Sequence, residues 1–162
     1  MTNDIEEGFE RVFRERAAAR RRALQEKLER QSRAQTFRNA FREHVRTVIG
    51  PTLEFLQELL EKNGIAAEIQ ETGSADEREE LEPSIGLRAN AEDRRPTPYL
   101  ADAIVQLTYS CSADKRVVAV SGSCAIKGRG TNRSSSDVSL HELTEEAVQR
   151  HFLALMHGQP LR

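Results

Sequence analysis

The chain contains few of the residues that build disulfide-rich or membrane-embedded proteins. Among its 162 residues there are two cysteines and no tryptophan. Two cysteines, Cys111 and Cys124, are too few for a disulfide scaffold. No run of about 18 uncharged apolar residues occurs, so we expect no membrane-spanning helix and no membrane partner. The first ten residues are acidic, unlike a signal peptide, and we therefore expect a cytoplasmic protein.

Catalytic and metal-binding patterns are also scarce. The four histidines show no HxH or HExxH spacing, and the two cysteines form no CxxC motif. Both cysteines fall within strand-like segments, where buried thiols usually serve packing. No acid, base and nucleophile converge in the sequence, so we expect no enzyme, no metal and no cofactor.

Charge is strongly segregated along the chain although the formal net charge is only -2. Residues 1–10 carry four acidic and no basic side chains, whereas residues 11–46 carry 12 basic and 4 acidic ones. Residues 54–93 reverse this balance with 3 basic and 12 acidic side chains. Such blocks favour an interaction with a partner of opposite charge, either protein or nucleic acid, and pairing of the opposite charges with each other explains the same counts.

Residues 1–49 are predicted to form one long, coiled-coil-like helix, because strong helix formers dominate and proline is absent. Apolar residues recur every three or four positions and form a stripe on one side. This stripe comprises Ile5, Phe9, Phe13, Ala17, Leu24, Leu28, Phe37, Phe41, Val45 and Val48. It is thin in the middle, so the helix needs a partner helix along a narrow seam.

The basic residues of this helix are the strongest candidates for partner binding. They are Arg20, Arg21, Arg22, Lys27, Arg30 and Arg33. A row of cations along a helix suits an acidic protein, and it also suits the phosphates of a nucleic acid. Aromatic residues for base stacking are not interleaved among them, so the nucleic-acid interpretation is the alternative.

Gly50-Pro51 is expected to kink or break the helix, since proline lacks an N–H donor. A second helix at 52–62 should end at Asn63-Gly64. The apolar period then changes to two and predicts four antiparallel strands, at 65–71, 85–91, 100–111 and 117–126. A tight turn around 113–116 places Cys111 opposite Val118 and keeps the two cysteines apart, so no disulfide is expected.

Residues 128–136 (GRGTNRSSS) are predicted to form a polar loop. Lys127, Arg129 and Arg133 surround its small residues and are candidates for an anion contact. A last helix follows, with Ser139 or Thr144 as its N-cap and an apolar face that packs on the sheet.

These patterns predict an α+β protein with an extended basic interaction helix at 1–49 and a small α+β domain at 50–162. We expect a non-enzymatic, oligomeric interaction or adaptor protein whose long helix mediates association and whose α+β domain binds a partner. Its partner is a second copy or another helical protein. The alternative is a nucleic-acid-binding accessory protein that uses the arginine-rich helix.

Overall fold

The computed structural model describes residues 2–73, 82–90, 104–126 and 130–161 and has an α+β fold. The chain divides into two compact units, residues 1–36 and 37–162. This division precedes the 49/50 boundary suggested by the sequence, because Phe41, Val45 and Ile49 are buried within the second unit.

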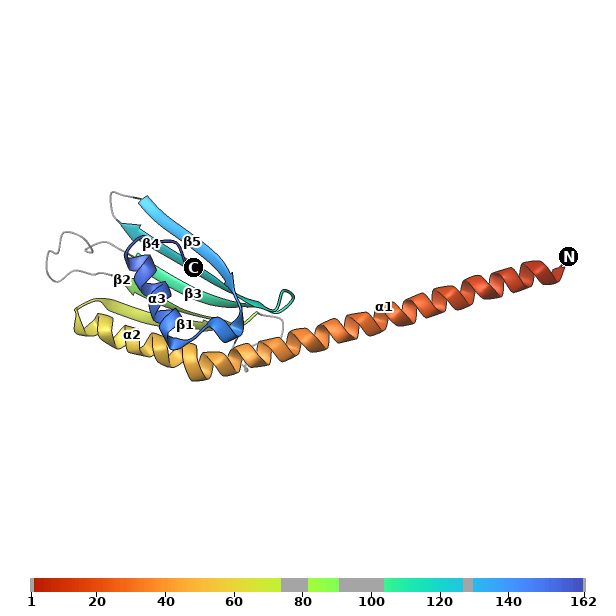
Figure 1. Ribbon diagram of the computed structural model, residues 1–162, viewed down its shortest axis with the longest axis horizontal. Coiled ribbons are helices and arrows are strands. Elements are labelled where there is room, and N and C mark those ends of the chain that lie inside the picture. Colours follow the sequence, from red (N-terminus) through yellow and green to blue (C-terminus); the bar gives the residue numbers. More distant parts are fainter. Residues whose placement is uncertain (1, 74–81, 91–103, 127–129, 162) are drawn as a thin grey trace. The chain divides into compact units, whose positions relative to one another are not determined.

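Three helical segments follow one another without a break (Figure 1). They are the helix α1 (Thr2–His44), the π-helical turn η1 (Val45–Ile49) and the helix α2 (Gly50–Lys62). The Gly50 N–H donates to the Val45 carbonyl, five residues back, and a Cβ at Gly50 would lie 2.8 Å from that oxygen. The sequence therefore locates the irregularity correctly, but a wide turn accommodates Pro51 and the helix is not broken there.

A five-stranded antiparallel sheet follows the helices, with its strands in the order β1-β2-β3-β4-β5. The strands are β1 (Ala66–Thr72), β2 (Ser84–Asn90), β3 (Ile104–Ser112), β4 (Val117–Ile126) and β5 (Gly130–Val138). Four strands were expected and the structure has five. The fifth strand contains residues 130–136, for which the prediction of a polar loop at 128–136 is therefore wrong. These residues pair with β4 throughout, from Ile126↔Gly130 to Val118↔Val138. Their serines and charges concealed the strand because they show no apolar alternation.

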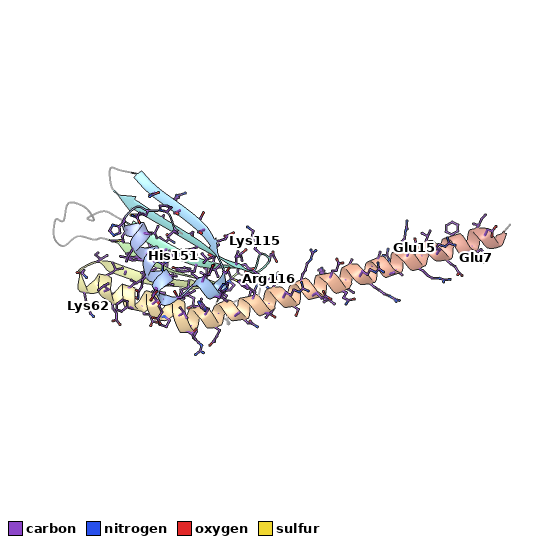
Figure 2. All side chains as sticks on the ribbon, in the orientation of Figure 1. Glu7, Glu15, Lys62, Lys115, Arg116 and His151 are labelled. Carbon is purple, nitrogen blue, oxygen red and sulfur yellow. The ribbon has the colours of Figure 1, made fainter. Side chains whose placement is uncertain are left out.

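The register between β3 and β4 is the predicted one. Cys111 faces Val118, Tyr109 faces Val120 and Val105 faces Cys124. A four-residue turn at 113–116 joins the strands, and Arg116 adopts a positive φ of 55° at its end. Figure 2 shows Lys115 and Arg116 at this turn. The two cysteines are buried and free, which confirms that no disulfide joins them.

One face of the sheet is apolar and carries the core of the second unit. Its buried residues on the strands are Ile85, Leu87, Ala89, Val105, Leu107, Tyr109, Cys111, Val118, Val120 and Cys124. The helix α2 contacts β1 and β2, and the helix α3 (Glu145–Met156) contacts β3 and β4. Within this core the Tyr109 hydroxyl lies 3.1 Å from His151 Nδ1 on α3.

The helix ends are set by local hydrogen bonds. Ser139 caps the 3₁₀ turn η2 (Leu140–Glu142) through a capping box, and Thr144 caps α3 by accepting from the Ala147 N–H at 3.2 Å. Of the two alternative caps predicted for the last helix, Thr144 is the one used, and Ser139 caps the preceding 3₁₀ turn instead. At the end of α2, Gly64 has a φ of 79° and Ile65 N–H donates back to the Leu60 carbonyl.

We predict that Gly122→Ala destabilises the second unit by about 1–3 kcal/mol, because a Cβ there would overlap the Leu155 methyl groups on α3. Urea unfolding measures the loss. Leu155→Ala removes the methyl groups that the new Cβ would meet. The double variant should therefore lose less unfolding free energy than the sum of the losses of the two single variants. Fully additive losses would contradict the predicted contact. Gly8→Ala is the control, since nothing lies within 4 Å of a Cβ at Gly8.

Candidate interaction surfaces

Residues 2–36 of α1 expose large apolar side chains to solvent. The most exposed ones are Ile5 (64%), Phe9 (61%), Phe13 (63%), Leu24 (59%) and Leu28 (57%). Isolated exposed apolar residues are normal on a protein surface, but a row of them marks a contact site. Although α1 has 43 residues, no helix of the described part of the chain is apolar enough to cross a membrane.

These residues lie along one side of the helix. Ile5, Phe9 and Phe13 follow one another at intervals of four, and Leu24 comes eleven residues after Phe13, which is three helical turns. The Phe9 and Phe13 rings stack with their centroids 6.4 Å apart. We call this row, from Ile5 to Leu28, the apolar stripe. Within its own unit it has only its neighbours on the same helix to pack against.

The predicted partner-binding cations surround the helix and do not form one patch. Arg20 lies seven residues after Phe13 and four before Leu24, so it falls on the apolar stripe. Arg22 is two residues further, about 200° around the helix, and lies on the opposite side. Figure 2 likewise shows side chains leaving α1 in several directions, among them Glu7 and Glu15. Sequence reasoning selected the cations as site residues and expected the apolar stripe to pair with a partner helix; the structure leaves the large side chains of that stripe exposed.

Most of these cations have no acidic partner on the helix. Arg14 pairs with Glu10 at 2.7 Å and Arg33 with Glu29 at 3.8 Å, and all four side chains are largely exposed. Such exposed pairs contribute about 0–1 kcal/mol each. Among the described residues, no carboxylate lies within 4.0 Å of five further cations. These are Arg20, Arg21, Arg22, Lys27 and Arg30.

The face of the sheet that points away from the helices is polar. Gln106, Thr108, Ser121 and Ser123 lie on it beside Arg133, and they line a shallow hollow of about 500 Å³. Arg133 is exposed on β5, directly opposite Ser123 on β4. Of the predicted anion contacts, the structure thus brings Arg133 together with hydroxyl groups. Lys127 and Arg129 lie outside the described residues.

Catalytic chemistry finds little support in the buried titratable groups. His44 Nε2 lies 2.5 Å from the Leu143 carbonyl, and His151 Nδ1 lies 3.1 Å from the Tyr109 hydroxyl, so both imidazoles are hydrogen-bonded within the fold. Burial raises the pKa of the Cys111 thiol to about 12, and the neighbouring Glu82 acts in the same direction. Burial also raises the pKa of Cys124. Across the described ranges, three or more potential metal ligands do not gather at any one place.

An ion pair connects the last turns of α1 to the segment just before β2. Arg38 donates to Glu82 at 2.9 Å, and this bond raises the pKa of the guanidinium group. Arg38 and Arg42 both oppose the rise in the pKa of Cys111 through their charge, without reversing it. The Cys111 thiol therefore stays protonated near neutral pH, and a protonated thiol is a poor nucleophile.

No protein-family model matches this chain, and no curated protein or solved structure matches it either.

We predict that neither thiol of the folded protein is alkylated by iodoacetamide at about pH 8, whereas both react in urea. The neutral Cys111 thiol stabilises the fold fully below its unfolded pKa of about 8.5. As the pH rises from there towards about 12, the unfolded chain releases the proton first, so stability falls. Urea midpoints at increasing pH measure this loss, and Cys111→Ala should reduce it, whereas the contribution of Cys124 remains. Rapid labelling of the folded protein would contradict the burial.

Proposed function

We propose that the protein is a non-enzymatic interaction protein whose N-terminal helix pairs with an amphipathic helix of an acidic partner protein. The observation that carries the proposal is the apolar stripe, whose large side chains are 57–64% exposed. The row stays within about 140° of the helix circumference, which suits one facing helix.

The apolar stripe supplies enough surface for a seam of modest strength. Burying one Phe or Leu side chain fully is worth about 1.5–3 kcal/mol relative to its exposed state. Phe9 and Phe13 form the larger contact patch, and Leu24 with Leu28 form the smaller one. Residues 17–19 between them are alanines, which bury little area. The partner is therefore expected to hold the helix mainly at the two ends of the apolar stripe.

The charge of the helix favours a partner other than a second copy of itself. Residues 11–22 contain six arginines and one glutamate. Two copies aligned on this segment, in either direction, would place like charges against each other. A partner helix with carboxylates flanking its apolar face would instead provide complementary charge, which favours encounter and specificity.

Nucleic-acid binding is the second candidate, and the five cations without an acidic partner favour it. Phosphate contacts by several arginines would make the affinity fall steeply with salt. An apolar seam would weaken much less under the same change. The two proposals therefore differ in how strongly the binding affinity depends on salt concentration, which a salt titration measures.

A reducing, cytoplasmic setting completes this proposal. Its support is that both cysteines are free and buried, since an oxidising compartment favours paired cysteines. The proposal of a non-enzymatic protein is supported by the raised pKa of the Cys111 thiol and by the hydrogen bonds that His44 and His151 make within the fold.

We predict that Phe9→Asp with Phe13→Asp weakens partner binding at least tenfold, because two charges would enter the apolar seam. The measurement is affinity capture by the full-length protein from nuclease-treated lysate, followed by titration with the purified captured protein. Phe55→Asp is the matched control, since Phe55 is 54% exposed on another helix. The control should bind like the wild type.

Several outcomes would contradict the helix-pairing proposal. If the double variant binds as tightly as the wild type, the apolar stripe is not the contact site. If capture disappears with nuclease and the affinity falls steeply with salt, the nucleic-acid alternative replaces it. Circular dichroism and urea unfolding confirm that each variant retains the fold of the second unit.

A further inference from the structure

The strand β5 forms one edge of the sheet and pairs only with β4 among the described strands (Figure 1). It spans nine residues, Gly130–Val138, and its register with β4 runs without interruption. The C-terminal segment bonds to the side chains of Asn132 and Ser134. Ser134 belongs to the helix-covered face, because it lies opposite Gly122, which contacts Leu155.

The hydrogen-bond pattern shows which backbone groups of β5 face outwards. The Cys111 N–H donates to the Pro83 carbonyl on the β2 side of β3. Backbone groups alternate between the two sides of a strand, so the even-numbered residues of β3 bond to the odd-numbered residues of β4. The even-numbered residues of β4 then bond to the even-numbered residues of β5. This pattern directs the N–H and C=O groups of alternate residues of β5 to the open edge. These residues are Thr131, Arg133, Ser135 and Asp137.

Long edge strands usually carry a feature that prevents pairing with another chain, such as charged side chains, a proline or a bulge. The strand β5 has no proline and no bulge, and its two charged residues, Arg133 and Asp137, are of opposite sign. The opposite edge strand, β1, is different, because Gln57 on α2 donates to the Ala67 carbonyl at 2.9 Å. Its charged residues, Glu68 and Glu71, are both acidic and would repel a second β1 strand. Among the described residues, β5 is thus the edge strand whose outward backbone groups make no hydrogen bond to a side chain and whose charges are not all of one sign.

The charged residues of β5 are arranged symmetrically about its centre. Arg133 lies two residues before Ser135, and Asp137 lies two residues after it, in the sequence RSSSD. In an antiparallel pair of two β5 strands centred on Ser135, Arg133 of each copy lies opposite Asp137 of the other. A shift of four residues would place Arg133 against Arg133 or Asp137 against Asp137. Opposite charges in facing positions stabilise a pair of strands and like charges destabilise it, so the charges select one register.

We propose that β5 pairs with β5 of a second copy of this chain, so that two five-stranded sheets join into one ten-stranded sheet. The pair is antiparallel and centred on Ser135, with two ion pairs between Arg133 and Asp137. Both side chains are exposed in the single copy and make no ion pair within the described residues. Strand addition of this kind gains its affinity from main-chain hydrogen bonds and its specificity from the side chains.

Sedimentation equilibrium of the full-length protein at about 1–100 µM tests this proposal, and a dimer is expected. Arg133→Glu should raise the dimer dissociation constant at least tenfold, because glutamate then faces Asp137 twice. Asp137→Arg should do the same. The double variant with both changes restores opposite charges at the same positions and should recover the dimer. Arg150→Glu, an exposed charge reversal on α3, is the control and should leave the dimer unchanged.

Ser135→Pro provides a second test that does not depend on charge. The Ser135 N–H faces the open edge, so proline removes a donor from the proposed interface and none from the pairing with β4. The variant should remain folded by circular dichroism and become monomeric.

A wild-type protein that is monomeric at about 100 µM would overturn the proposal. So would a dimer that Arg133→Glu and Ser135→Pro both leave intact. Phe9→Asp with Phe13→Asp separates this interface from the N-terminal helix, because that variant should keep the β5 dimer while it loses the acidic partner. If it loses the dimer instead, the copies associate through the helix and the β5 proposal is wrong.

Discussion

The alternation of side chains along the strands is the constraint on which the second unit depends. On β3 and β4 the residues of one face, such as Leu107 and Val120, are completely buried, whereas Gln106 and Ser121 on the other face are exposed. A sheet of this kind has to cover its apolar face with helices and can leave its polar face in water. The chain provides α2 and α3 together with the last turns of α1 for that cover. The π-helical turn serves the same purpose, because an extra residue in one turn keeps Phe41, Ile49 and Leu53 on the buried side.

Much of this arrangement could be predicted because the residues act locally. The Asn63-Gly64 end of α2, the N-caps at Ser139 and Thr144 and the register between β3 and β4 each follow from a few neighbouring residues. The strand β5 could not be found in the same way, since its inward residues Ser134 and Ser136 are small and polar. Its place depends on β4, whose Val118, Val120 and Cys124 are buried in a sheet that extends to both sides. A tertiary requirement of this sort leaves only a weak trace in the local sequence.

The candidate sites show the same difference between local and spatial information. The composition of α1 drew attention to its arginines, yet arginines at 20, 21 and 22 necessarily point in three directions on a helix. Only the spacing of the apolar residues defines a direction, and the structure shows that Ile5 to Leu28 remain exposed along it. Arg133 was predicted as an anion contact beside Lys127 and Arg129, but its neighbours on the sheet are hydroxyl groups and the edge of β5. Asp137, its symmetric counterpart, becomes visible only once the strand is recognised.

The two proposed contacts reinforce each other in a physical sense. The apolar stripe is thin between Ala17 and Ala23, so a single helix would hold its partner only moderately. A dimer formed through β5 would carry two such helices, and once one of them is bound the second binding event is intramolecular. Linked sites of this kind can raise the overall affinity by about 10²–10⁴ without any new contact. A partner with a single helix would then bind the dimer weakly and dissociate readily. A partner with two helices would bind both N-terminal helices of the dimer and dissociate slowly. Selectivity for a paired partner would then arise from the symmetry of the sheet edge, while the chemistry of recognition stays with the helix.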